Sequence, residues 1–78
     1  MPTLLKWNGF RFYFFSNEGY EPPHLHVDKG DNSAKIWLHP IKLGNNYGFT
    51  EKEISVILEK ITEKQTEFLG AWNEYFRK

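Results

Sequence analysis

Two of the three histidines in this 78-residue chain are separated by a single residue, and they are the side chains best suited to chemistry. His24 and His26 stand at positions i and i+2, so in a β-strand both imidazoles point to the same face of the sheet. Arg11 and Lys35 have the matching parity in neighbouring predicted strands. An imidazole beside such cations can take a proton from a ribose 2′-hydroxyl while the cations stabilise the charged phosphate. We therefore expect His26 as the acid–base residue, His24 as a second acid–base or positioning residue, and Arg11 and Lys35 as electrostatic stabilisers.

A metal site is the second chemistry that these imidazoles allow. His39 has the same parity as His24 and His26 on the next predicted strand, and three imidazoles that leave one position open form a catalytic zinc arrangement. Asp28 is an alternative third ligand. Because the neighbouring cations repel a dication, no metal and no other cofactor is expected, and a zinc ion held by the three histidines is the alternative.

The same face is rich in aromatic and basic side chains. Aromatic rings on an open sheet stack RNA bases while cations follow the phosphates, and exposed aromatic residues are equally typical of protein interfaces. The candidate RNA- or partner-binding residues are Lys6, Tyr13, Phe15, Trp37 and, in the C-terminal segment, Trp72. An RNA-binding or RNA-cleaving protein, a non-enzymatic interaction module and ordinary half-exposed strand histidines all stay open, so the sequence does not decide whether the protein is an enzyme.

The elements that must position these residues begin with a β-hairpin. Asn8-Gly9 between apolar runs predicts a type I′ turn joining strands at 3–7 and 10–15. This turn places Lys6 opposite Arg11 and Leu4 opposite Tyr13. Like charges directly opposite each other destabilise a sheet, which suggests that an anion binds between Lys6 and Arg11.

A second hairpin is predicted from strands at 24–28 and 34–39, joined by a type II′ turn with Gly30 first. Its register pairs His26 with Lys35 and His24 with Trp37. Pro40 ends the last strand, and the Gly- and Asn-rich segment 41–49 is interpreted as a loop. Residues 1–49 therefore predict a four-stranded antiparallel meander made of two hairpins.

Residues 50–78 predict helix. Thr50 and Glu53 have the spacing of a capping box, and apolar residues follow at 3–4-residue spacing. One helix over 51–77 would be roughly 40 Å long at about 1.5 Å per residue, which exceeds the roughly 17–20 Å of the strands. We therefore expect a kink or break, with Thr62 and Gly70 as the weak points, and a homodimer or partner contact made by the C-terminal end of the helix. The predicted fold class is α+β, with a long C-terminal helix, either continuous or broken into two, packed on one face of the sheet.

Composition limits the protein class. The length predicts a single domain over 1–78, and ten basic residues balance ten acidic ones, which excludes a wholly basic nucleic-acid binder. The absence of cysteine excludes disulfides and thiolate metal sites. No apolar run is long enough to span a membrane and the N-terminus lacks signal-peptide features, so a cytoplasmic protein without membrane contact is expected.

A family resemblance is carried by the segment Glu21-Pro22-Pro23-His24-Leu25-His26-Val27, together with residues 1–3, 11–19, 46–49 and 71–76. Over essentially the whole chain, the sequence resembles a small prokaryotic family, domain of unknown function 4160; members often have Ile where Leu25 stands. The resemblance implies a toxin–antitoxin-type arrangement with a small cognate protein partner. It supplies no catalytic residues, so the roles above rest on the residues themselves.

Overall fold

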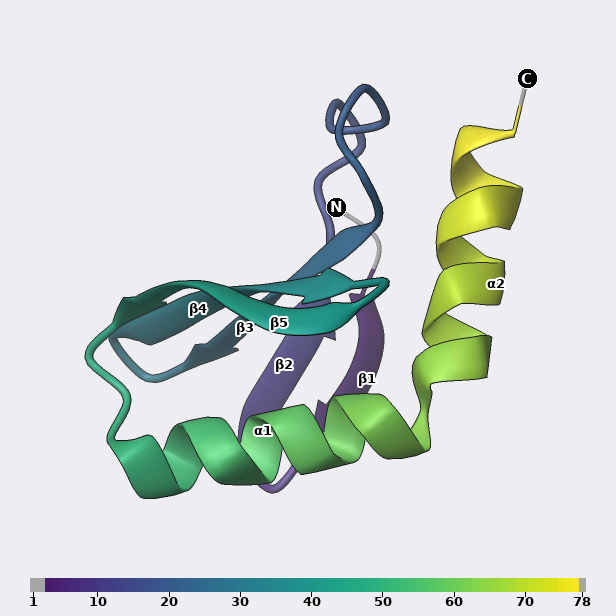
Figure 1. The fold of residues 1–78 in the computed structure, drawn as a ribbon. Coiled ribbons are helices and arrows are strands. Elements are labelled where there is room, and N and C mark those ends of the chain that lie inside the picture. The colour runs from purple at the N-terminus through teal and green to yellow at the C-terminus, as the bar shows by residue number, and fades with distance from the viewer. Residues whose placement is uncertain (1–2, 78) are drawn as a thin grey trace.

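The computed structural model describes residues 3–77, and it contains a five-stranded antiparallel sheet followed by two helices (Figure 1). The elements are β1 (Thr3–Trp7), β2 (Phe10–Tyr13), β3 (His24–Lys29), β4 (Asn32–Leu38), β5 (Ile41–Tyr47), α1 (Glu51–Glu63) and α2 (Gln65–Phe76). The strands pair in chain order, as a meander. The α+β class is confirmed, whereas the predicted count of four strands is wrong. Met1, Pro2 and Lys78, which the predicted segments include, lie outside the described residues.

The first hairpin has the predicted turn. Asn8 and Gly9 have φ of 51° and 83°, and two positive values are what a type I′ turn requires. Lys6 pairs with Arg11 as expected. A register shift in β1 makes Thr3, rather than Leu4, the partner of Tyr13, which corrects that predicted pair.

The second hairpin is confirmed in both turn and register. Gly30 has φ of 59° in the two-residue connection, His26 pairs with Lys35, and His24 pairs with Trp37. The alternation of apolar and polar residues fixes this register, because a slip by one residue would turn every apolar side chain away from the core.

The segment 41–49 is not a loop, as predicted, but contains the edge strand β5. A connection of His39 and Pro40, whose peptide bond is cis, returns the chain alongside β4. The register shifts near Gly44, where a Cβ atom would lie 3.0 Å from the carbonyl oxygen of Lys35. Gly and Asn lower the β-propensity of this segment, but pairing with β4 outweighs that preference.

The core lies between the sheet and the helices. Alternate residues of β2, β3 and β4 point to this side and are almost fully buried: Phe10, Phe12, Leu25, Val27, Ala34, Ile36 and Leu38. Helix α1 runs beneath the sheet in Figure 1 and contributes Ile54, Ile57 and Ile61 to the same cluster. The predicted capping box is present, since the Thr50 hydroxyl accepts from the backbone N–H of Glu53 and the Glu53 carboxylate accepts from that of Thr50.

The helical segment breaks at Lys64, not at Thr62 or Gly70. The 13 residues of α1 span about 20 Å at about 1.5 Å per residue, which matches the strands. Ile61 is the last buried residue of α1, and the Gln65 amide then donates a hydrogen bond to the carbonyl of Leu38 at the end of β4 (2.8 Å). The break therefore falls where the sheet ends, and Gly70 lies inside α2.

Helix α2 turns upward from α1 and runs beside the segment that connects β2 to β3 (Figure 1). Trp72 packs its ring on Phe14, with ring centroids 5.2 Å apart. Phe76 approaches so closely that a Cβ atom at Gly19 would lie 2.5 Å from its ring, so only glycine fits there without a shift. The C-terminal residues expected at a dimer or partner contact thus pack inside the molecule. Among the described residues, no helix is long and apolar enough to cross a membrane.

Replacing Trp72 by alanine tests this packing. Trp72 is only 4% exposed, so Trp72→Ala is expected to lower the free energy of unfolding by about 3–5 kcal/mol, as for other buried aromatic residues. Urea unfolding followed by circular dichroism measures the change. Tyr20→Ala is the control, because Tyr20 is 83% exposed and its loss is expected to change stability by less than about 0.5 kcal/mol. Equal, small effects of the two substitutions would contradict the packing of α2.

Candidate functional site

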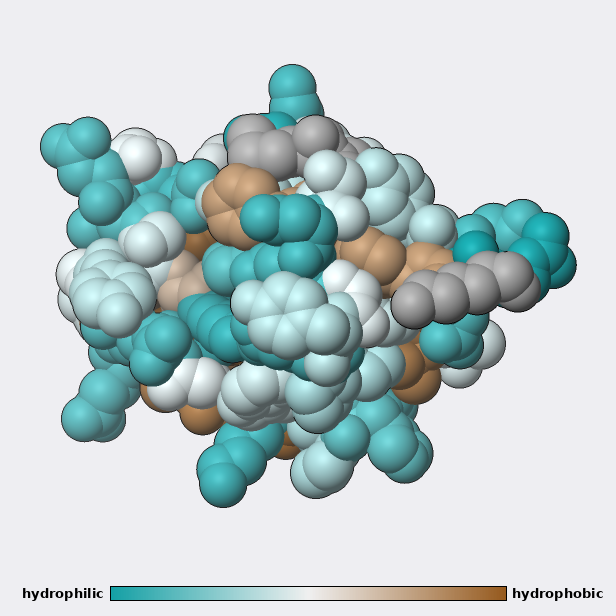
Figure 2. All heavy atoms as spheres, turned by 90° about the horizontal axis from the view of Figure 1, so that it is seen from above, coloured by the Kyte–Doolittle hydropathy of each residue, from teal (hydrophilic) through white to brown (hydrophobic). Residues whose placement is uncertain are grey.

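The sheet face opposite α1 carries rows of polar and aromatic side chains that run across the strands. The central row pairs Tyr13 with His26, His26 with Lys35, and Lys35 with Asn45. Figure 2 views the molecule from the side opposite α1, and the hydrophobic residues visible there are separated by hydrophilic ones. The structure therefore confirms that His26 and Lys35 are neighbours, and it adds Tyr13 and Asn45 on either side of them.

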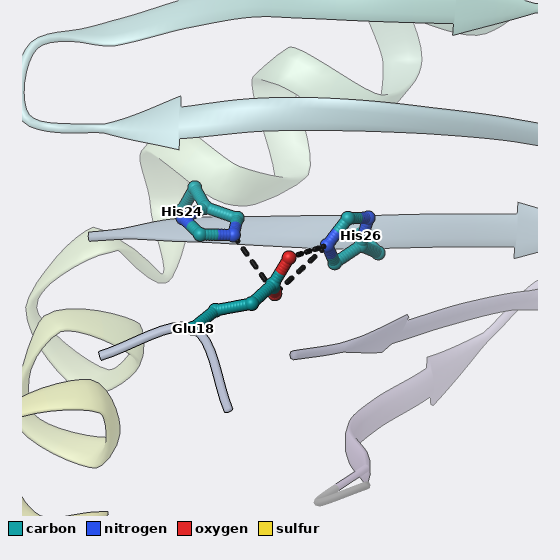
Figure 3. A group of neighbouring side chains, drawn as sticks. All are labelled: Glu18, His24 and His26. Atoms are coloured by element: carbon teal, nitrogen blue, oxygen red, sulfur yellow. Dashed lines mark hydrogen bonds and ion pairs between the residues drawn. The ribbon is translucent and has the colours of Figure 1, made fainter. Parts of the chain in front are cut away.

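The carboxylate of Glu18 joins the two histidines of β3. Its Oε1 lies 2.9 Å from His24 Nε2 and 3.0 Å from His26 Nε2, and its Oε2 lies 3.2 Å from His26 Nε2. Figure 3 shows the carboxylate between the two imidazoles, reached from the segment that precedes β3. One nitrogen from each ring and one carboxylate oxygen all lie within 4.8 Å of one another. We call these three side chains the Glu18 cluster.

Local hydrogen bonds of the β2–β3 connection place Glu18 over the sheet. The backbone N–H of Glu18 donates to the carbonyl of Phe15 (3.3 Å), and that of Glu21 donates to the carbonyl of Glu18 (3.1 Å), which makes two successive turns. The Glu18 carboxylate also accepts from the backbone N–H of Phe15 (3.3 Å). The connection is thus tied to itself and, through Glu18, to β3.

His24 is completely buried, which bears on the two roles expected for it, a second acid–base residue or a positioning residue. Its ring packs on Trp72 and Trp37, with centroids 5.0 and 5.5 Å away. Its Nδ1 lies 2.9 Å from the backbone carbonyl of Pro22. A carbonyl only accepts, so Nδ1 carries a hydrogen and donates it. Because a fully buried ring does not reach a substrate directly, this burial favours a positioning role over an acid–base role for His24.

The environment of Glu18 favours its charged form. Partial burial acts to raise the pKa of its carboxyl, but the hydrogen bonds with His24 and His26 act in the opposite direction, and the resulting pKa lies below the ordinary value of a glutamate. Because Glu18 keeps its negative charge, the cluster carries a carboxylate that attracts a proton or a cation to the two imidazole nitrogens.

His26 lies at the border of an open cavity of about 430 Å³, a volume within the usual range of ligand pockets. Its side chain is 19% exposed, and its ring stacks on Tyr13 and meets Phe15 edge-on, with centroids 5.6 and 4.8 Å away. The cavity is lined by Tyr13, Phe15, His26, Asp28, Gly30, Asp31, Asn32, Ser33, Ala34, Lys35, Asn45 and Tyr47. Of the two histidines in the cluster, His26 is the one that lines this cavity.

Tyr13 and Asp28 form a second polar pair in the cavity wall. The Tyr13 hydroxyl donates to Asp28 Oδ2 (2.9 Å). Burial, together with this hydrogen bond to a carboxylate, raises the pKa of Tyr13 to about 12, so the phenol stays protonated. The other oxygen of Asp28, Oδ1, is buried without a hydrogen-bond partner among the described residues. Asp28 lies outside the Glu18 cluster, so the structure does not support it as a third metal ligand beside His24 and His26.

Among the cations of this face, and within the part of the chain that the structure describes, Lys35 is paired with a carboxylate, whereas Lys6 and Arg11 are not. Lys35 donates to the carboxylate of Glu21 (2.7 Å), a contact that lowers the pKa of Glu21. Arg11 stacks over Tyr13 at 4.5 Å and donates through Nε to the hydroxyl of Thr3 (2.9 Å). Within residues 3–77, neither Lys6 nor Arg11 forms an ion pair with a carboxylate.

The remaining predicted site residues lie elsewhere. His39 is exposed in the connection between β4 and β5, and with Trp37 it borders a second hollow of about 330 Å³. It therefore does not join His24 and His26, and the predicted three-histidine zinc site is not formed. Trp72 is a core residue, and its burial removes it from the surface available to RNA or a partner.

Glu18 is the site residue that the sequence did not single out. It comes from a connection rich in Gly and Pro, whose path cannot be derived from the period-2 pattern that placed the histidines. The available signal was an acidic residue a few positions before a His-X-His strand, and this signal becomes informative only when the connection folds back over the sheet.

Comparison with known proteins identifies a family. Residues 9–73 match the model of a family described as a domain of unknown function, DUF4160. No curated protein and no solved structure shows a significant match to the chain.

The positioning role of His24 predicts a contrast with His39. His24→Ala removes a fully buried ring that holds both Glu18 and Pro22, and it is expected to lower the free energy of unfolding by about 2–4 kcal/mol. His39→Ala removes an exposed ring and is expected to change it by less than about 0.5 kcal/mol. Urea unfolding curves of the two variants decide the matter, and a His24→Ala protein as stable as His39→Ala would contradict this account.

Proposed function

The chain belongs to the DUF4160 family, and we propose that it acts on RNA at the sheet face opposite α1, as one member of a toxin–antitoxin-type pair. The observation that carries the proposal is the position of His26. Its imidazole borders the 430 Å³ cavity and is hydrogen-bonded to the charged carboxylate of Glu18. A carboxylate that orients an imidazole is a recurring arrangement for general acid–base catalysis.

The chemistry that this arrangement supports is transesterification of the RNA backbone. With Nε2 of His26 donating to Glu18, Nδ1 is the nitrogen left to accept the proton of a ribose 2′-hydroxyl. The 2′-oxygen then forms a bond to phosphorus while the bond from phosphorus to the 5′-oxygen breaks, and the leaving oxygen takes a proton from solvent. Glu18 stabilises the imidazolium that forms.

Charge on this face fits a phosphodiester chain. Lys6 and Arg11 are paired directly opposite each other, and within the described part of the chain neither has a carboxylate partner. On β3 the cross-strand partner of Arg11 is Asp28, which offsets part of this charge. The Lys6–Arg11–Asp28 group keeps a net positive charge, which favours an anion such as phosphate. Two carboxylates on this face have polar partners, since Glu21 binds Lys35 and Oδ2 of Asp28 accepts from Tyr13, although Oδ1 of Asp28 has no hydrogen-bond partner within residues 3–77.

The cavity also offers surfaces for a base. Phe15 and Tyr47 both line it, and the Tyr47 side chain is 64% exposed. Stacking of single-stranded bases on such rings contributes about 1–3 kcal/mol per base. Lys35, beside His26 in the central row, lies where it can contact the phosphate of the same nucleotide.

A small protein partner is the second candidate. Tyr20, Tyr47 and Tyr75 are the large hydrophobic residues with high exposure, and tyrosine is enriched at protein interfaces. A module that only binds a partner predicts that RNA stays both uncleaved and unbound.

An RNA cleavage assay separates these functions. Purified wild-type protein is incubated with a short single-stranded RNA, and total RNA is examined after tightly controlled expression in bacteria. Cleavage is expected from wild type and from His39→Ala, while His26→Ala is expected to lower the rate by about 10²–10⁴-fold, the usual contribution of general acid–base catalysis. Equal cleavage by His26→Ala, or wild-type protein that neither binds nor cleaves RNA, would contradict the proposal.

A further inference from the structure

We propose that Glu18, His24 and His26 bind a divalent metal ion of the zinc class. The inference goes beyond the proposed action on RNA and stands without it. It rests on the hydrogen-bond inventory, the distances and the surroundings of the Glu18 cluster. The ligand set differs from the one expected from sequence, because Glu18 takes the place of His39.

The hydrogen bonds of His24 require a proton or a metal ion at its Nε2. Nδ1 donates its hydrogen to the carbonyl of Pro22 (2.9 Å). In a neutral ring, Nε2 then carries a lone pair, and it faces Oε1 of the Glu18 carboxylate at 2.9 Å. Two acceptors do not meet at this distance unless a proton or a metal ion lies between them.

The same oxygen faces His26 Nε2 at 3.0 Å, so three electron-pair donors converge on one point (Figure 3). Zinc bonds of about 2.0–2.1 Å with tetrahedral angles place neighbouring ligand atoms about 3.3 Å apart. The observed oxygen–nitrogen distances are a few tenths of an ångström shorter, and the group as a whole lies within 4.8 Å. A small outward movement of the Glu18 side chain therefore accommodates an ion.

The surroundings of the ligands are those of a metal centre. A ligating histidine usually donates its other N–H to a carbonyl or carboxylate, which fixes the tautomer and the ring, and the Pro22 carbonyl does this for His24. His26 is held by stacking on Tyr13 and by the edge of Phe15. His24 is fully buried, while Glu18 and His26 are 15% and 19% exposed, so the ligands are ordered and one side stays accessible.

From the sequence, the neighbouring cations were expected to repel a metal ion. In the structure, these cations are engaged with other groups. The nearest predicted cation, Lys35, is paired with Glu21 at 2.7 Å. Arg11 is drawn toward Tyr13 and Thr3. Two imidazoles and one carboxylate are a ligand set typical of zinc sites that keep an open position for water.

The test is zinc binding measured without RNA. Full-length protein without a polyhistidine tag is titrated with Zn²⁺ alone by isothermal titration calorimetry, and with Co²⁺ in an optical titration that reports a tetrahedral site. Wild type is expected to bind one ion per chain, and His39→Ala is expected to bind equally well. Glu18→Gln and His26→Ala should each weaken binding by at least about 10–100-fold, since even loss of an outer partner costs a metal site that much.

Thermal unfolding keeps the test decisive if a variant is unstable. An ion that binds only the native state raises Tm, so Zn²⁺ should raise the Tm of wild type and His39→Ala, and a chelator should reverse the rise. Circular dichroism verifies that Glu18→Gln and His26→Ala are folded. Absence of saturable zinc binding by wild type, or binding lost in His39→Ala and kept in Glu18→Gln, would overturn the metal site. Neither result bears on RNA cleavage, so the two proposals fail separately.

Discussion

The contact between the Glu18 carboxylate and the buried imidazole of His24 is the interaction on which the site depends. Because Nδ1 of His24 is committed to the Pro22 carbonyl, its Nε2 meets Glu18 only through a proton or a metal ion. The proton or metal ion between Glu18 and His24 links the β2–β3 connection to β3. It also sets the carboxylate where it reaches His26 at the border of the cavity. Burial makes the requirement strict, since an uncompensated polar group costs most where water is excluded.

The lengths of the helices and strands explain how the connection is held over the sheet. Helix α1 is as long as the strands it covers and ends at the edge of the core. The rest of the helical segment therefore turns at Lys64. Helix α2 then packs on the sheet through Phe68, whose ring stacks on Phe12 of β2, and on the connection through the residues that follow. Trp72 then contacts both Phe14 and His24, and Phe76 lies against Gly19. Helix α2 thus contacts both the connection, at Gly19, and the Glu18 cluster, at His24, so the excess helical length contributes directly to the geometry of the site.

Local signals predicted the parts of the fold that local rules control. Asn8-Gly9 and Gly30 fixed two turns, and those turns fixed the registers that make His26 a neighbour of Lys35. Strand β5 was missed because Gly44 and the two asparagines that follow it indicate a loop, whereas pairing with β4 decides its conformation. The break at Lys64 was misplaced because the position of the sheet edge, not the helix propensity of Thr62 or Gly70, sets it. Glu18 was missed for a similar reason: its position depends on a tertiary fold of the connection that no periodic pattern encodes.

Nitrogen NMR of the imidazoles tests the central claim most directly. Long-range ¹H–¹⁵N correlation spectra of metal-free wild type and Glu18→Gln, recorded at the same pH, report the proton on every ring nitrogen. The account predicts a protonated Nδ1 on His24, and Nε2 signals that move in Glu18→Gln for both His24 and His26 while those of His39 stay unchanged. Unchanged Nε2 signals of His24 and His26, or an equal change at His39, would contradict a carboxylate shared by these two imidazoles.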